Sequence, residues 1–353
     1  MRVLHVNDNP PGDGFGGAEV FLARLVAAQR ERGDEVDVLT GDGSHVGARA
    51  VLDLWDRRSH QRLRERVRVF RPDVVHVHNV VRQLSPAVLR PTGVRTVMTF
   101  HDLRSFGGSE HRLPDPRAAA DLLVLNPLVR RLASATTVVG VSETVAAVLR
   151  SAGLDATAVP VPVPAPTATP QPVEECHDVL FAGKLSADKG VLVLVEAFER
   201  LNHPTARLVL AGDGPLQVAG VGRLPQHQVS EAMGRSRVVV VPSLPSLRRE
   251  GSSLTAVEGA RHGRPVVGSD DPAVAEVMGA LGGDVVPAGD VTALAARLDH
   301  WLSHPAEAAA AGAASRERAE VFDPARVAEA YAEIYARPVS GSGGDRRGRA
   351  GPC

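Results

Sequence analysis

The sequence predicts an α/β protein in which two Rossmann-like domains, each a doubly wound parallel sheet, face a common cleft. Short apolar runs alternate with segments of helical periodicity along most of the chain. A proline-rich stretch interrupts this alternation once, and the alternation then restarts. A chain of 353 residues with 44% apolar residues is also longer than one ordinary hydrophobic core supports. Strands that alternate with helices form parallel sheets covered on both faces, so two such sheets are expected.

The first domain is predicted over residues 1–158. Apolar runs typical of buried strands lie at 2–7, 35–40, 73–79, 96–102 and 136–142. Residues 18–33 have apolar side chains at helical spacing, and Gly33 suits the C-terminal cap of that helix. Open parallel sheets bind ligands at the carboxyl ends of their strands. We therefore expect the polar and glycine-rich segments after these strands to line a site.

Residues 159–173 are predicted to be a stiff linker, because they hold six of the 26 prolines. The second domain is predicted over residues 174–322. Its apolar runs lie at 178–185, 206–214, 237–244 and 264–270, and its helical patterns lie at 191–201, 228–236 and 293–302. A last helical pattern covers 324–336. Residues 339–353 have almost no apolar side chains to bury and are expected to be disordered.

Composition narrows the classes of partner and location. The formal net charge of -1 gives no reason to expect a nucleic acid or an anionic membrane as partner. The two cysteines, Cys176 and Cys353, do not make a disulfide framework, so we expect a reducing compartment. The N-terminus lacks the apolar segment of a secretion signal, and no apolar run reaches the roughly 18 residues that cross a bilayer. We expect a cytoplasmic protein, and peripheral contact with a membrane surface stays open.

A glycine-rich loop after the first predicted strand has three interpretations. Gly12, Gly14 and Gly17 match the G-x-G-x-x-G fingerprint of dinucleotide-binding dehydrogenases, and Asp42 lies roughly where their acidic residue lies. That fingerprint follows the strand directly, whereas the segment DNPP intervenes here. We favour the interpretation that Gly16 and Gly17 let backbone amides at a helix N-terminus approach an anion. A tight turn without a ligand is the third interpretation.

Histidines near two strand ends raise the alternative of a metal site. His76 and His78 lie two residues apart on a predicted strand and so point to one face, and His101 ends the next predicted strand. Three imidazoles can bind zinc. The sequence around them lacks the fixed short spacing of cysteine or acidic ligands typical of such sites, and histidines at strand ends are often only hydrogen-bonded. We expect no metal and interpret His101 as a hydrogen-bond donor that faces the cleft.

The only two lysines of the chain stand close together. Of the 40 basic residues, Lys184 and Lys189 are lysines and the other 38 are arginines. Lys184 ends a predicted strand and Lys189 precedes a predicted helix, so both are placed to meet a diphosphate near that helix N-terminus. A compact, movable ammonium suits this role. The alternative is that both are ordinary solvated charges.

Five segments of the chain carry a resemblance to a known family. They are GGAE at 16–19, FHD at 100–102, GKLSADKG at 183–190, LAGDGPL at 210–216 and PSLPSLRREGSSLTAVEGARHGRPVV at 242–267. In this order they resemble the family 4 retaining glycosyltransferases of the GT-B fold. The resemblance covers nearly all of residues 1–337. Its most specific part is a pair of glutamates, Glu250 and Glu258, with seven residues between them.

The resemblance implies an enzyme of hexosyltransferase type that moves a sugar from a nucleotide-diphosphate-sugar donor to a hydroxyl group. It implies retained anomeric configuration and no metal or other cofactor. The donor would lie mainly on the second domain. The acceptor, a small molecule, a glycan or a lipid-linked molecule, would lie mainly on the first, where the irregular segment 103–117 is expected to line its side. The resemblance also implies that a C-terminal helix, residues 323–338, packs back on the first domain.

The same resemblance assigns the diphosphate to four residues. Lys184 and Lys189 contact it from the second domain, and Gly16 and Gly17 approach it from the first. Two lysines and helix N-termini can stabilise the growing charge of a leaving diphosphate without a cation.

The donor sugar and the ribose are assigned to the segment around the two glutamates. His101 and Glu250 are the catalytic candidates: His101 faces the donor sugar, and Glu250 contacts its hydroxyl groups. Glu258 hydrogen-bonds the ribose. Further donor contacts are expected from Gly251, Ser252, Ser253 and Leu254. The family usually reads EGFG where this chain reads EGSS, which leaves the preferred sugar open.

Two other functions remain as alternatives. One is a nucleotide-sugar epimerase or sugar phosphorylase on the same fold, which would release a rearranged or free sugar without an acceptor. The other is a non-catalytic nucleotide-sugar binding protein, which would bind a donor and turn nothing over.

Overall fold

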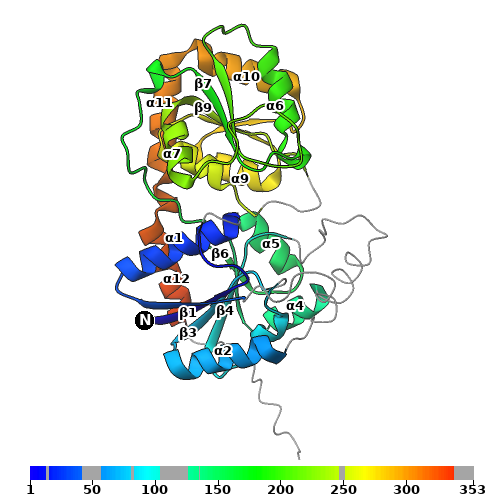
Figure 1. Cartoon of the computed structure of the whole chain (residues 1–353), viewed down its shortest axis with the longest axis vertical. Helices are drawn as coiled ribbons and strands as arrows, with labels where there is room; N and C mark the ends of the chain where they lie inside the picture. The colour runs from blue at the N-terminus through cyan, green and yellow to red at the C-terminus, as the bar shows by residue number, and fades with distance from the viewer. Residues whose placement is uncertain are drawn as a thin grey trace, which may run out of the picture.

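The structure is a computed structural model that describes residues 1–12, 16–41, 57–80, 83–103, 126–134, 136–245 and 251–337. Two lobes, one above the other in Figure 1, are each built around one parallel sheet. The predicted fold class is confirmed. The segment expected to be a disordered tail, 339–353, lies outside the described residues.

The first lobe holds a six-stranded sheet in the order β2-β1-β3-β4-β5-β6, with all neighbours parallel. Its strands are β1 (Arg2–Asn7), β2 (Glu35–Thr40), β3 (Val74–Val77), β4 (Arg95–Phe100), β5 (Thr137–Gly140) and β6 (Ala156–Ala158). The strands β1, β3 and β5 are valine-rich and almost wholly buried, as a parallel sheet between helical layers requires. The strand order reverses between β1 and β3, and their carboxyl ends mark the place where such sheets bind ligands.

Helices pack against this sheet. They are α1 (Gly17–Glu31), α2 (Arg57–Phe70), the 3-10 turn η2 (Pro86–Leu89), α4 (Asn126–Ala133) and α5 (Glu143–Ser151). α1 buries Phe21, Leu22 and Leu25 on one face, which is the helical spacing that the sequence shows. α5 begins after Ser142, whose Oγ accepts a hydrogen bond from the Val145 amide at 3.2 Å.

The second lobe holds a five-stranded parallel sheet in the order β11-β10-β9-β7-β8. Its strands are β7 (Asp178–Ala182), β8 (Arg207–Ala211), β9 (Ser236–Val241), β10 (Val266–Ser269) and β11 (Asp284–Val286). Its helices are η5 (Val173–Glu175), η6 (Ala187–Lys189), α6 (Val191–Glu199), α7 (Gln226–Arg235), α8 (Leu254–Arg261), α9 (Pro272–Leu281), α10 (Val291–Ser303), α11 (Pro305–Arg318) and η7 (Ala319–Phe322). Here the strand order reverses between β7 and β9. The segment after β7 therefore lies where a parallel sheet of this kind binds ligands, as the ends of β1 and β3 do in the first lobe.

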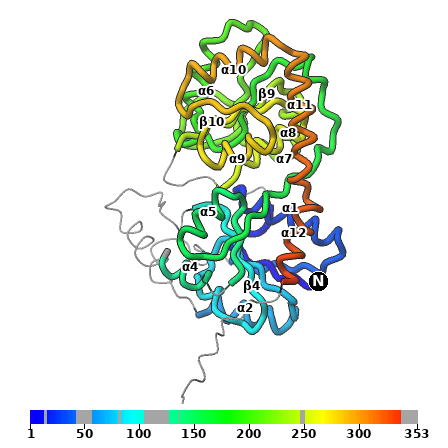
Figure 2. Tube along the Cα trace, turned by 180° about the vertical axis from the view of Figure 1, so that it is seen from behind, coloured from blue at the N-terminus to red at the C-terminus, as the bar shows by residue number. Residues whose placement is uncertain are grey.

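Two segments join the lobes. Residues 159–172 contain no helix or strand, and Val159, Val161 and Val163 among them are buried in the core of the first lobe. At the other end of the chain, α12 (Pro324–Ala336) leaves the second lobe and lies against α1, as Figures 1 and 2 show at the red end of the colour scale. None of the helices within the described ranges is long and apolar enough to span a bilayer.

Candidate active site

The segment before α8 in the second lobe lies directly against the first lobe. A Cβ atom on Gly251 would lie 1.9 Å from the carbonyl oxygen of His101, so only glycine fits there. The Ser142 hydroxyl donates to the Gly251 carbonyl at 2.5 Å. A Cβ atom on Gly17 would lie 3.3 Å from Cδ1 of Leu254. The structure thus brings together the start of α1, the end of β4 and the start of α8, all three of which the sequence assigned to one site.

Local capping fixes the start of α8. Ser253 is the N-cap, and its Oγ accepts a hydrogen bond from the Ala256 amide at 3.3 Å. The Thr255 hydroxyl donates to the Ala182 carbonyl at 3.0 Å and so ties the helix to the end of β7. The positive end of a helix dipole lies at its first amides. The predicted donor contacts 251–254 therefore lie where an anion or a sugar hydroxyl is favoured.

The start of α1 carries a carboxylate of its own. Gly16 precedes the helix, and Glu19 in its first turn is buried. The Glu19 Oε1 accepts hydrogen bonds from the side-chain amides of Asn7 at 3.3 Å and Asn9 at 3.1 Å. Glu19 therefore stabilises the N-terminus of α1 and anchors the loop after β1 to it.

Glu258 lies at the junction of the two lobes. Its side chain is 11% exposed, and its Oε1 forms an ion pair with the guanidinium of Arg24, which is also 11% exposed. Arg24 comes from α1 of the first lobe, and Gln226 of the second lobe donates to the same oxygen at 3.0 Å. Glu258 is therefore not a solvated helix residue.

The lysine-containing turn lies at the end of β7. Gly190 has a φ of 67°, and a Cβ atom there would lie 1.8 Å from the Pro242 carbonyl oxygen, so this turn requires glycine. The Leu244 amide donates to the Asp188 carbonyl at 2.8 Å, which holds the turn against the segment after β9. Both contacts fix the backbone on either side of Lys189.

The two lysines have different environments. Lys184 is exposed, whereas Lys189 is half-buried. Desolvation lowers the pKa of Lys189 from its ordinary value, and the charge of Lys184 lowers it further, although Asp188 and Asp271 oppose the shift. Ser186 between them is buried, and its hydroxyl has no hydrogen-bond partner among the described residues. Lys189 and the buried hydroxyl of Ser186 therefore lie in one turn, at the end of β7.

The histidines form a buried hydrogen-bonded cluster. Nε2 of His101 lies 3.0 Å from Nδ1 of His78. Ring nitrogens of His5, His76 and His78 lie within 4.8 Å of one another, as a metal site would need. All six ring nitrogens of these three residues, however, already have hydrogen-bond partners. A metal ion would have to replace several of those bonds, so we interpret the cluster as a hydrogen-bond network.

Several residues of the site were missed from the sequence. They are His5, Arg24, Ser186 and Gln226. For His5 a signal existed, because β1 and β3 are predicted neighbours and the structure pairs His5 with His76 in register. The others come from helices and turns that no local pattern assigns to the site.

Some predicted residues lie outside the described ranges. Glu250, Gly14, Asp42 and nearly all of the segment 103–117 are among them, so their assignments stay predictions.

Comparisons with known proteins agree on the family. The model for Glycosyltransferase Family 4 matches residues 15–164, and the model for Glycosyl transferases group 1 matches residues 176–304. The chain is similar to the O-antigen chain mannosyltransferase C of Escherichia coli. The two are 25% identical over an alignment 373 positions long, which covers 95% of this chain and 98% of the relative.

Solved structures share the whole fold. The sucrose-phosphate synthase of Thermosynechococcus elongatus has a TM-score of 0.74 at 18% identity, over 95% of this chain and 98% of that chain. Anabaena Alr3699/HepE, in a complex with UDP-glucose, has a TM-score of 0.70 at 17% identity, over 95% of this chain and 99% of that chain. The two family models match one lobe each, in the order that the sequence motifs require. The chain therefore belongs to the family 4 glycosyltransferases, glycosyl transferases group 1, of the GT-B fold.

Proposed function

We propose that this enzyme transfers a sugar from a nucleotide-diphosphate sugar to a hydroxyl acceptor, with retained anomeric configuration and without a metal ion or another cofactor. The observation that carries the proposal is the turn after β7, which holds both lysines of the chain and the buried Ser186 hydroxyl, because such a turn can bind the charge of a diphosphate. The similar Anabaena protein is described in a complex with UDP-glucose, a donor of this class.

The protein's own charges support a metal-independent reaction. When the bond from the sugar to the diphosphate breaks, negative charge grows on the leaving oxygen. Lys184, Lys189 and the first amides of α8 are placed to stabilise that charge, which is the role of a divalent cation in other enzymes. We infer that Lys189 binds the diphosphate most strongly, because an anion would offset the burial that lowers the pKa of its ammonium.

The carboxylate geometry favours front-face transfer over a covalent route. Glu258 is engaged by Arg24 and Gln226, so it is not placed as a nucleophile, and the paired carboxylates of two-step hydrolases are not evident in the described part of the chain. We infer that the acceptor hydroxyl attacks the face from which the diphosphate leaves. The acceptor oxygen then bonds to the anomeric carbon, the bond to the diphosphate oxygen breaks, and that oxygen takes the acceptor's proton.

Glu258 is proposed to bind the ribose. Arg24 and Gln226 both reach its Oε1, so among the described residues Oε2 remains to accept a ribose hydroxyl. A carboxylate held by two donors keeps its charge and its orientation, which favours a strong hydrogen bond.

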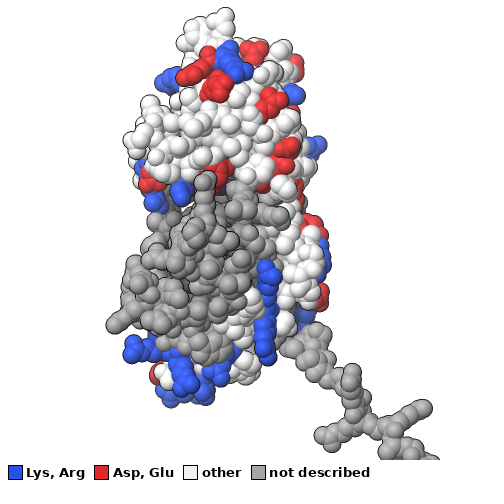
Figure 3. Space-filling model, turned by 90° about the vertical axis from the view of Figure 1, so that its right-hand side faces the viewer, with Lys and Arg blue, Asp and Glu red and all other residues white. Residues whose placement is uncertain are grey.

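The acceptor side lies on the first lobe. The relative from Escherichia coli is named for an O-antigen chain, a glycan, which supports a glycan or lipid-linked acceptor here over a small molecule. The helix α2 of that lobe exposes five arginines, Arg57, Arg58, Arg64, Arg66 and Arg68. Figure 3 shows basic side chains gathered at the end of the molecule where α2 lies in Figure 1. We propose that this face contacts anionic membrane surfaces on the cytoplasmic side.

A two-stage assay tests the proposed function. A thermal-shift screen with UDP, GDP, ADP and TDP and their sugars identifies the donor, because a ligand of the native state raises its stability. The donor is then incubated with and without candidate hydroxyl acceptors, and the products are analysed. A glycosylated acceptor with retained configuration is expected. A rearranged or free sugar without acceptor would support an epimerase or phosphorylase instead. Binding without turnover under any condition would support a binding protein.

A further inference from the structure

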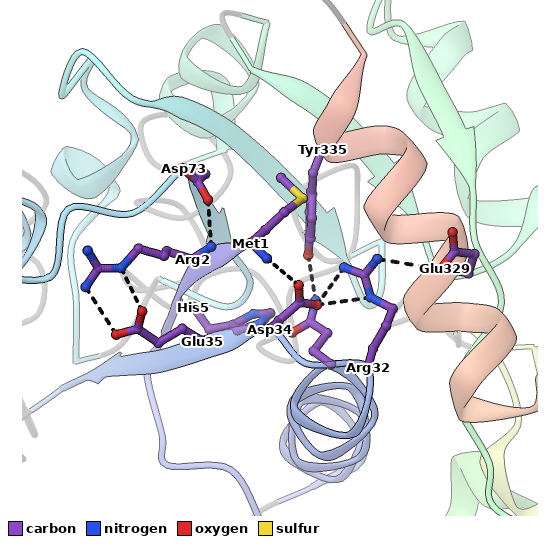
Figure 4. A network of polar contacts seen from close by, with 10 residues as sticks. Met1, Arg2, His5, Arg32, Asp34, Glu35, Asp73, Glu329 and Tyr335 are labelled. Carbon is purple, nitrogen blue, oxygen red and sulfur yellow. Dashed lines mark hydrogen bonds and ion pairs between the residues drawn. The ribbon is translucent and has the colours of Figure 1, made fainter.

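A continuous chain of buried hydrogen bonds links His101 to the C-terminal helix α12. Nε2 of His101 lies 3.0 Å from Nδ1 of His78, and Nε2 of His78 lies 3.0 Å from Nδ1 of His5. Nε2 of His5 lies 2.7 Å from Oε1 of Gln29, whose Nε2 donates to the Tyr335 hydroxyl at 3.1 Å. Figure 4 shows Tyr335 reaching from α12 towards the strand that carries His5. The chain thus crosses the first lobe from the candidate active site to its far helix.

A second branch begins at the same tyrosine and leads away from His101. The Tyr335 hydroxyl lies 2.7 Å from Nδ1 of His76, and Nε2 of His76 lies 2.7 Å from Oγ1 of Thr99. That hydroxyl lies 3.0 Å from the hydroxyl of Tyr331. This branch has the same burial and chemistry, but these hydrogen bonds among the described residues lead to His101 only back through Tyr335 and Gln29, which makes it a matched internal control.

The three inner histidines are neutral. His5, His76 and His78 are wholly buried, and burial lowers the pKa of His5 to about 4 and the pKa values of the other two well below 6.5. A neutral imidazole has one N–H donor and one acceptor nitrogen. Each ring in the chain can therefore donate in one direction only, and the direction chosen at one end holds along the whole chain.

Gln29 sets that direction. Its carbonyl oxygen faces His5 and its amino group faces Tyr335. A carbonyl only accepts, so Nε2 of His5 carries the proton and Nδ1 of His5 accepts. His78 must then donate from Nε2 and accept at Nδ1. As a result, His101 must donate from its own Nε2 to His78.

We propose that this chain fixes the tautomer of His101, with Gln29, His5 and His78 acting as positioning residues. A neutral His101 held in this way keeps its proton on Nε2, so its Nδ1 is an acceptor and not a donor. The proposal rests on the proposed function, in which His101 faces the reacting sugar. A ring that exchanged tautomers would be a donor at Nδ1 part of the time, and its hydrogen bonding in the site would change.

Nuclear magnetic resonance of ¹⁵N-histidine-labelled full-length protein tests the tautomer directly. The His101 signals are identified by their loss in His101→Gln. In the wild type, His101 is expected to carry its proton on Nε2. In His78→Phe, which keeps a ring but removes both nitrogens, His101 should become a mixture of tautomers. In the control His76→Phe, on the same strand and in the other branch, the His101 tautomer should stay as in the wild type.

Kinetics of the same variants test whether the tautomer of His101 affects sugar transfer. His78→Phe should lower kcat by about three- to tenfold, the effect of one hydrogen bond, and leave the affinity for the nucleoside diphosphate unchanged. His76→Phe should leave both unchanged once the fraction of folded protein is equal. If either substitution prevents folding, Tyr335→Phe and Tyr331→Phe replace the pair, because only Tyr335 contacts Gln29.

The outcomes separate this inference from the proposed function. A His101 tautomer unaffected by His78→Phe and by Tyr335→Phe overturns the positioning role, whatever the turnover. Equal changes in the test and control variants also overturn it, because they indicate a general effect on the core. A tautomer change in a protein that turns over no donor leaves the inference standing and counts against the proposed function instead.

Discussion

Replacing Glu258 is the sharpest test of how this enzyme holds its donor. In Glu258→Ala the proposed hydrogen bond to the ribose is lost, and so is the partner of Arg24. A hydrogen bond to a charged group contributes about 1.5 to 3 kcal/mol, which corresponds to a roughly tenfold to hundredfold loss of affinity. Glu258→Gln keeps the shape and one acceptor but loses the charge. We therefore expect it to lose about two- to tenfold, as for a neutral hydrogen bond.

Glu258→Ala should lose the same affinity for the free nucleoside diphosphate as for the intact donor, because both contain the ribose. The variant loses binding energy that is equal in the ground state and in the transition state, so KM rises and kcat stays nearly unchanged. Isothermal titration with both ligands, set beside transfer kinetics, measures this. Glu250→Ala, whose residue is predicted to touch only the sugar, should show the reverse pattern.

A matched control separates ribose binding from a looser contact between the lobes. Glu276 of α9 also bridges the lobes, because its carboxylate accepts hydrogen bonds from the amides of Glu143 at 2.7 Å and Thr144 at 2.6 Å. Glu276→Ala should lower stability but bind the nucleoside diphosphate like the wild type. Equal affinities for wild type and Glu258→Ala, or equal losses in Glu258→Ala and Glu276→Ala, would refute the assignment of Glu258 to the ribose.

Four further predictions follow from the charges and the two-lobed architecture. Lys189→Ala should weaken nucleoside diphosphate binding by about 1.5 to 3 kcal/mol and leave nucleoside binding nearly unchanged, whereas Lys184→Arg should bind better than Lys184→Ala; equal diphosphate affinity of Lys189→Ala and wild type in calorimetry would place these lysines outside the site. Transfer should persist in excess EDTA, and a loss that Mg²⁺ or Mn²⁺ restores would contradict the metal-independent reaction. The folded-state pKa of His5 is about 4, against 6.5 in the unfolded chain, so its contribution is complete above pH 6.5. Stability should fall as the pH drops from 6.5 to 4, by on the order of 3 kcal/mol for His5 and by more because His76 and His78 also have lowered pKa values; pH-independent stability in denaturant titrations over that window would contradict the buried neutral rings. The donor should make the protein more compact in small-angle scattering, because binding energy can close the two lobes; an unchanged radius of gyration would indicate a preformed site.

The sheets were predictable because parallel strands between helical layers are continuous apolar runs. β9 is such a run, with the sequence SRVVVV and every residue buried. β6 and β11 were missed, since each has only three residues, ATA and DVV, and no periodicity can be read over that length. The helix α11 was missed for a different reason. Its alanine-rich sequence has no clear apolar stripe, so its position depends on packing instead of pattern.

Some residues of the candidate site could also be predicted from the sequence, and others could not. Lys189 stands out in the sequence because it is one of only two lysines among 40 basic residues, and Gly251 was assigned from the family resemblance. Arg24 does not stand out, since it is one of 38 arginines and its partner Glu258 lies 234 residues away. Gln29 and Tyr335 are 306 residues apart. Contacts over such separations are set by how the lobes and α12 pack, which no local pattern contains.

The contacts that join the lobes use the same elements that build the site. Ser142 binds the Gly251 carbonyl just before α8, and Arg24 binds Glu258 in the middle of α8. The first lobe therefore holds this helix at two points. A movement that separated the lobes would break these bonds and would also part His101 from Gly251, whose backbones are in contact. The contacts that hold the lobes together therefore also hold the elements of the candidate site together. Because Arg24 and Glu258 pair across the lobes, the proposed binding of a nucleotide to Glu258 would also stabilise the arrangement in which the lobes are in contact.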